Sequence, residues 1–226
     1  MKKRIKLQGT LVFLAVILSV ILKKYVIPDW GREGMEEFFD IAGLILVFSG
    51  FALRILARGY KEEKTHGGNK LVVNGPYRLM RNPMYFGTLL IGVGVISVLF
   101  KWWVLLLFFL AYIIIYLPQV NKEEKMLLDR FGKDYKDYCK SASKYFPHPL
   151  RLLNTKAYLS ELKFFWIKKE LPSLFTTILI IFSLEIYQDV LMFGLGQIYD
   201  EALEFILIIA FFTLLTWAVI YKNKHK

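Results

Sequence analysis

The sequence predicts an all-α fold, a polytopic membrane bundle of about six helical spans with amphipathic helices on the cytoplasmic surface. Hydrophobic residues make up 56% of the 226-residue chain. Several apolar runs approach the roughly 20 residues that cross a bilayer, and Lys and Arg gather in alternate connections between these runs. This composition is typical of an integral, multi-pass membrane protein rather than a soluble domain.

The charge and the metal-binding residue types exclude several other classes. The formal net charge is +11, but the basic residues fall where membrane topology requires them, so we expect no nucleic-acid partner. The single cysteine, Cys139, leaves no pair for a disulfide within the chain. The histidines, His66, His148 and His225, are too scattered to predict a metal site.

The first two spans are predicted at residues 7–22 and 38–57. Four basic residues precede the first run, as in a signal peptide, but no small-residue cleavage site follows. Lys23 and Lys24 come directly after the run, where their side chains can extend to the interface. We therefore expect an uncleaved span, and residues 1–40 form an N-terminal span and loop.

The third and fourth spans, residues 84–100 and 102–117, are separated by Lys101 alone and must form a tight antiparallel hairpin. Pro118 ends the fourth span or kinks it, because proline has no N–H to donate to a helical carbonyl. If the helix continues, Tyr116, Gln119 and Glu123 share one face at spacings of three and four.

The rest of the chain alternates surface helices and spans. Residues 122–144 read as a charged amphipathic helix interrupted at Phe131 and Gly132. Its apolar side is made by five residues: Met126, Leu127, Phe131, Tyr135 and Tyr138. Residues 157–171 have the pattern of an interfacial helix on anionic lipid, and two more spans are predicted at 171–186 and 202–221.

The distribution of Lys and Arg predicts the orientation. The N-terminus, the loop after the second span, the segment after the fourth span and the C-terminal tail are basic. By the positive-inside rule both termini face the cytoplasm, together with the loop 71–87 and the pair Glu123 and Glu124.

The loop 71–87 is polar, although it lies between apolar spans. Gly75 and Pro76 predict a turn. Pro83 pushes Asn82 out of the α region and suits the first turn of the next helix. The free N–H groups of that helix then face the loop. A capping loop and a ligand site both remain open on these residues alone.

Several blocks then recur in a characteristic order: LVVNGPY from Leu71, RNPMYFG from Arg81, Glu123–Glu124, and FGKDY from Phe131. In this order and spacing they resemble the isoprenylcysteine carboxyl methyltransferase and phospholipid methyltransferase superfamily. The resemblance covers residues 41–147 and implies a methyltransferase core at 41–149, leaving an interfacial helix and two spans at 150–226. It also implies an active site on the cytoplasmic side that binds S-adenosylmethionine.

The resemblance assigns site residues by position. Glu123 and Gln119 are the expected catalytic residues. The expected cofactor-binding residues are Asn69, Lys70, Leu71, Val72, Tyr77, Arg81, Asn82, Pro83, Met84, Tyr85 and Glu124. Asn69 and Asn82 stand where the carboxyl methyltransferases have His, and His66 is a candidate for the missing imidazole. Gln119 stands where they place a substrate-holding Arg, so a prenylcysteine carboxylate would lack its counter-ion.

The resemblance implies methyl transfer to a lipid or lipidated substrate that enters from the bilayer. An isoprenylcysteine carboxylate needs no base, whereas a phospholipid amine arrives protonated and needs one, for which Glu123 is the candidate. Tyr77 and Tyr85 suit a sulfonium, and Arg81 suits the cofactor carboxylate or a lipid phosphate. An NADPH-dependent sterol-type reductase and a non-enzymatic scaffold or transporter remain alternatives.

Overall fold

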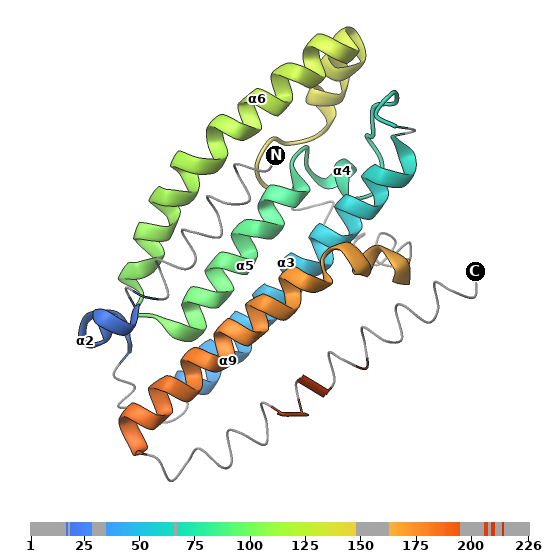
Figure 1. Cartoon of the computed structure of the whole chain (residues 1–226). Helices are drawn as coiled ribbons and strands as arrows, with labels where there is room; N and C mark the ends of the chain where they lie inside the picture. Colours follow the sequence, from blue (N-terminus) through green and yellow to red (C-terminus); the bar gives the residue numbers. More distant parts are fainter. Residues whose placement is uncertain are drawn as a thin grey trace.

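The computed structural model describes residues 17, 19–28, 35–65, 67–147, 163–194, 206–207, 209–210 and 214. These residues form helices and connections, with no named strand among them. The elements are α2 (Lys23–Val26), α3 (Met35–Lys64), α4 (Pro76–Leu79), α5 (Pro83–Leu99), α6 (Trp103–Ser141), the 3₁₀ helix η1 (Phe164–Lys169) and α9 (Leu171–Phe193). In Figure 1, α5 lies at the centre, and it contacts α3, α6 and α9.

Three of the described helices are long and apolar enough to cross a membrane: Glu37–Lys64, Trp103–Ser141 and Leu171–Leu191. The 17 residues of α5 are also apolar, but they rise only about 26 Å, slightly less than a bilayer core. The predicted all-α membrane fold is confirmed, and the count of six spans is not. The spans expected at 7–22 and 202–221 lie mostly outside the described residues.

Helices α3 and α5 pack backbone against backbone through glycines. A Cβ atom on Gly50 would lie 2.6 Å from the Gly87 carbonyl oxygen, and one on Gly43 would lie 2.8 Å from that of Gly94. Both pairs are spaced by seven residues, in opposite order along two antiparallel helices. Neither pair has the spacing of the usual motif for close approach, two small residues four apart.

The predicted hairpin of α5 and α6 is present. Across it, the Tyr112 hydroxyl donates to the Tyr85 carbonyl at 2.8 Å, and the Phe108 ring fills the space beside Gly92. Pro118 lies inside α6 and does not end it. The interruption comes at Gly132, whose φ of 50° and ψ of −113° lie outside the helical region. The last turns of α6 therefore fold back toward α4 (Figure 1).

The segment before α9 is held against α3 by a buried carboxylate. Glu170 is fully buried and accepts hydrogen bonds from Arg54 Nε at 2.9 Å and Arg58 Nη1 at 2.6 Å. Trp166 of η1 is also buried, against Gly59. The structure thus differs from the expectation of an interfacial helix at 157–171, in the part of that segment that it describes. Residues 164–169 form a short 3₁₀ helix on α3, because the aromatic face of Trp166 and the charge of Glu170 both find partners on that helix.

Candidate active site

The loop between α3 and α5 is fixed by Tyr77. Gly75 has a φ of 59°, a left-handed conformation that favours glycine, and α4 begins at the next residue in place of a simple turn. The Tyr77 hydroxyl donates to the Ala57 carbonyl at 3.2 Å. The Tyr77 carbonyl accepts from the Tyr138 hydroxyl at 2.6 Å. Burial raises the pKa of Tyr77 above its ordinary value, so this residue stays a protonated donor.

The start of α5 follows the sequence prediction. Asn82, with φ −123° and ψ 55°, lies outside the helical region, and Pro83 occupies the first turn. The Asn82 amide donates to Glu124 Oε1 at 3.3 Å and to the Lys144 carbonyl at 3.1 Å. Asn82 therefore ties the beginning of α5 to α6 and to the segment that follows α6.

The two neighbouring carboxylates of α6 have different partners. Glu123 Oε1 accepts from the Tyr85 hydroxyl at 2.6 Å and from Gln119 Nε2 at 3.0 Å, and both donors are neutral. Glu124 lies 3.0 Å from Arg81 Nε and 3.1 Å from Lys144 Nζ. The charge of Glu124 is thus balanced by two cations, whereas these two donors to Glu123 Oε1 are uncharged.

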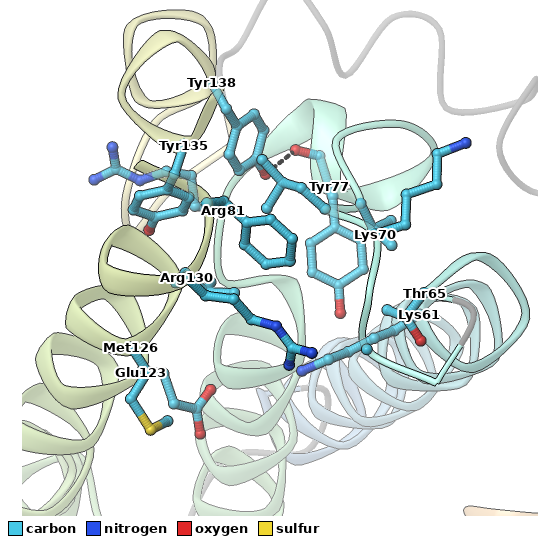
Figure 2. Close-up of a pocket in the computed structure, with 15 residues that line it drawn as sticks. Lys61, Thr65, Lys70, Tyr77, Arg81, Glu123, Met126, Arg130, Tyr135 and Tyr138 are labelled. Atoms are coloured by element: carbon cyan, nitrogen blue, oxygen red, sulfur yellow. Dashed lines mark hydrogen bonds between the residues drawn. The ribbon is translucent and has the colours of Figure 1, made fainter. Parts of the chain in front are cut away.

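A cavity of about 390 Å³ lies between the loop that connects α3 to α5, the end of α3 and residues 123–138 of α6 (Figure 2). Its walls combine apolar, aromatic and cationic side chains, and Glu123 is its carboxylate. The lining residues are Lys61, Thr65, Gly68, Lys70, Leu71, Val72, Tyr77, Arg81, Glu123, Met126, Leu127, Arg130, Phe131, Tyr135 and Tyr138. The five residues expected as the apolar side of an amphipathic surface helix all belong to this wall.

The residues expected from the sequence fall into three groups around the cavity. Six of them line it: Lys70, Leu71, Val72, Tyr77, Arg81 and Glu123. Five lie behind the wall and hydrogen-bond or ion-pair with lining residues or with each other: Asn69, Gln119, Asn82, Tyr85 and Glu124. Pro83 and Met84 begin α5 and do not line the cavity. His66 lies outside the described residues.

The sequence analysis missed three polar lining residues: Lys61, Thr65 and Arg130. Lys61 and Thr65 follow the apolar part of α3, where charged residues are common and carry little signal. Arg130 had a detectable signal, because it lies seven residues after Glu123 and thus on nearly the same face of a helix.

Two buried polar atoms suggest that the cavity suits a polar ligand. Among the described residues, Arg81 Nε and Tyr135 Oη are the buried side-chain polar atoms without a hydrogen bond, and both residues line the cavity. Arg81 Nε is within ion-pair distance of Glu124 but not in hydrogen-bond geometry. An unsatisfied buried donor costs about 1–3 kcal/mol. The described part of the chain holds no cluster of His, Cys, Asp and Glu suited to a metal.

Comparison with known proteins gives two matches. Residues 38–134 match the phospholipid methyltransferase family model. A protein-S-isoprenylcysteine O-methyltransferase from Dictyostelium discoideum is 35% identical over 80 residues, which are 35% of this chain and 34% of that protein. The chain thus matches about a third of the length of this relative. No solved structure matches the chain.

The family-model match includes most of the residues that line the cavity. Both matches are to methyltransferases rather than to the reductases considered as an alternative. Residues 38–134 of the chain are thus similar to membrane methyltransferases, as the phospholipid methyltransferase model and the isoprenylcysteine enzyme both indicate.

Proposed function

We propose that this protein transfers a methyl group from S-adenosylmethionine to a lipid or lipidated substrate at the Glu123 end of the cavity. One observation carries the proposal. A cavity with apolar, aromatic and cationic walls lies beside a carboxylate that Tyr85 and Gln119 hold at 2.6 and 3.0 Å. This arrangement has a place for a nucleoside, a place for a sulfonium and a group able to accept a proton.

The residues that line the cavity fit S-adenosylmethionine. Phe131, Tyr135 and Tyr138 provide aromatic faces and Leu71 and Val72 provide apolar contacts for an adenosine. Aromatic faces attract sulfonium as they attract ammonium. The bound cofactor would supply an electrophilic methyl group. The residues of the chain would align the substrate with that methyl and keep water away from it.

The surroundings of Glu123 favour an amine over a carboxylate as the methyl acceptor. A lipid ammonium would be attracted by Glu123, which would take its proton and leave the nitrogen lone pair free. The nitrogen then forms a bond to the methyl carbon as the carbon–sulfur bond breaks, and S-adenosylhomocysteine leaves. A carboxylate substrate would meet the like charge of Glu123, and the neutral Gln119 provides no counter-ion. The phospholipid amine is therefore the preferred substrate class, and the isoprenylcysteine carboxylate is the second candidate.

The proposed route of the substrate follows from the membrane-spanning helices. Tyr85 and Glu123 lie on α5 and α6, whose apolar parts form the hairpin, so a lipid would reach them sideways from the bilayer. The cofactor would enter from the basic, cytoplasmic side expected from the positive-inside rule. A water-soluble amine methylated as fast as a lipid amine would contradict this lateral route.

The test is a methyl-transfer assay with the full chain in lipid nanodiscs. Methyl-labelled S-adenosylmethionine is added to discs that contain phosphatidylethanolamine, and separately to discs that contain a farnesylcysteine derivative. We expect label in the phospholipid fraction. Label only in the farnesylcysteine fraction would favour the second candidate, and label in neither fraction, without binding of S-adenosylhomocysteine, would overturn the proposal.

A further inference from the structure

Several basic residues at this end of the bundle are paired with carboxylates. Arg54 and Arg58 bind Glu170, Arg81 and Lys144 bind Glu124, Lys163 binds Glu63 and Lys169 binds Glu62. Among the cations that line the cavity, Arg81 has such a partner. Lys61 and Arg130 also line the cavity, and no carboxylate among the described residues lies within ion-pair distance of either one.

Lys61 and Arg130 approach the cavity from opposite walls. Lys61 belongs to α3 and Arg130 to α6, and Figure 2 shows their charged ends pointing toward one another. The ammonium of Lys70, also a lining residue, points away from that space in the same view. Two like charges that face each other repel. An anion bound between them would be attracted by both cations and would offset their repulsion.

The position of Arg130 is fixed by its neighbours. Its Nη2 donates to Asn69 Oδ1 at 3.0 Å, and its Nη1 would lie 3.2 Å from a Cβ atom on Gly68. Gly68 has a φ of 93°, so the turn brings Asn69 beside the guanidinium and leaves room for it. A guanidinium held in this way is pre-organised for an oxyanion, because little side-chain entropy remains to be lost on binding.

We propose that Lys61 and Arg130 bind the carboxylate of the methionyl part of the cofactor, an assignment that rests on the proposed function. The sulfonium must face Glu123, where the substrate reacts. Arg130 lies seven residues further along α6, about 10 Å away along the helix, on the side of Glu123 away from the apolar part of α6, and Figure 2 shows it between Glu123 and Tyr135. The carboxylate end of the cofactor belongs there. A lipid phosphate, which stays near its acyl chains, would lie on the other side of Glu123.

This assignment replaces Arg81, which the sequence offered for the same carboxylate. Arg81 Nε lies 3.0 Å from Glu124, and Arg81 Nη1 donates to the Cys139 carbonyl at 3.4 Å. Its guanidinium thus already interacts with two residues of α6, Glu124 and Cys139. Arg130, by contrast, has only an amide oxygen as its hydrogen-bond partner among the described residues.

The experiment measures equilibrium binding of two nucleosides to the full chain in nanodiscs. S-Adenosylhomocysteine carries the carboxylate, and 5′-methylthioadenosine lacks the whole amino-acid group. We expect Lys61→Met and Arg130→Gln each to weaken S-adenosylhomocysteine about tenfold, the size of one charge-assisted hydrogen bond. Their affinity for 5′-methylthioadenosine should equal that of the unchanged protein. Decarboxylated S-adenosylmethionine, which keeps the amino group, should behave as methylthioadenosine does.

Matched controls separate this role from a general change of charge. Lys64→Met removes a lysine from the same helix end, and Lys133→Gln removes a cation from the same part of α6. Neither residue lines the cavity, and neither variant should change either affinity. Arg130→Lys keeps the charge and should recover part of the lost affinity.

Three results would overturn the assignment: equal weakening of both nucleosides in Lys61→Met and Arg130→Gln, no weakening of either nucleoside, or a raised KM for phospholipid with unchanged S-adenosylhomocysteine affinity. The last result would indicate that Lys61 and Arg130 bind a lipid phosphate instead. If the unchanged protein binds neither nucleoside, the proposed function fails as well, which distinguishes the two failures.

Discussion

Two carboxylates, Glu170 and Glu123, show how differently this chain treats a negative charge. Glu170 is fully buried and bonds to two guanidinium groups, those of Arg54 and Arg58. Glu123 lines a cavity, and its Oε1 atom bonds to a tyrosine hydroxyl and a glutamine amide. Glu170 thus has two cationic partners, whereas the two groups that donate to Glu123 Oε1 are neutral.

We propose that the charge of the hydrogen-bond partners, rather than burial alone, distinguishes a structural carboxylate from the proton acceptor of the proposed reaction. A buried charge is tolerated when it is paired, and removal of one partner leaves the other uncompensated. A general base must stay able to take up a proton, and cationic partners would oppose that. By this criterion Glu124, bound to Arg81 and Lys144, belongs with Glu170 although it is adjacent to Glu123.

The largest effect is expected for Glu123→Gln. The amide keeps the size of the side chain but cannot accept a proton from the substrate, so kcat should fall by about 10²–10⁴-fold. The binding of S-adenosylhomocysteine and the melting temperature should change little. These three quantities can be measured on the same nanodisc sample. A variant that retains most of its activity would show that Glu123 is not the proton acceptor.

Glu170→Gln should show the opposite pattern. It leaves Arg54 without its counter-charge and Arg58 with only the exposed Glu62, and should cost about 3 kcal/mol. This is the low end for a broken buried ion pair, because both arginines are partly exposed. Thermal unfolding should shift down by roughly 5–10 °C. Glu62→Gln, at an exposed carboxylate that also pairs with Arg58, is the matched control and should cost at most about 1 kcal/mol. Equal shifts of the melting temperature in the two variants would show that the buried ion pairs of Glu170 contribute no more to stability than an exposed one.

Gly50→Ala tests the helix contact that connects the two regions. Helix α3 carries Arg54 and Arg58, α5 carries Tyr85, and the new Cβ would lie 2.6 Å from the Gly87 carbonyl oxygen. Because backbone cannot move aside easily, we expect a loss of about 2 kcal/mol in unfolding free energy. Ser49→Ala, at an exposed position on the same helix, should be nearly neutral. An equally stable Gly50→Ala protein would contradict the close packing.

Tyr85→Phe should have the smallest effect of the four and sharpens the comparison most. It removes one neutral donor to Glu123 and keeps the ring, including its edge contact with Tyr116. A loss of about tenfold in kcat is expected, since one hydrogen bond to a charged group is removed. S-Adenosylhomocysteine affinity should stay constant. A weakened affinity with normal kcat would show that Tyr85 acts on the cofactor rather than through Glu123.

The helices and the meeting of Tyr85 with Glu123 were accessible from the sequence. Apolar runs and the single residue Lys101 predict the hairpin. The spacing of Gln119 and Glu123 predicts that they share one face of a helix, and the structure adds the hydrogen bond between them. Pro118 was ambiguous, because a proline in a long helix can end it or be absorbed by it. Here the helix continues, and the break lies at Gly132, where a positive φ is easily adopted.

The contacts between distant segments were not accessible. Nothing in the order of residues indicates that Glu170 reaches Arg54 and Arg58, which are over a hundred positions earlier. The same holds for Lys61, which becomes a cavity residue only because the loop after α3 returns along α6. Patterns of period and spacing describe single helices, and they do not report which two helices meet.

The buried position of Glu170 also bears on how far the chain can be shortened. The match to the family model ends at residue 134, yet Arg54 and Arg58 within it form ion pairs with a side chain beyond that limit. A polypeptide stopped at residue 147 would keep the residues that line the cavity, but Arg54 would lose its carboxylate partner and Arg58 would keep only the exposed Glu62. We therefore expect such a polypeptide to be less stable than the full chain.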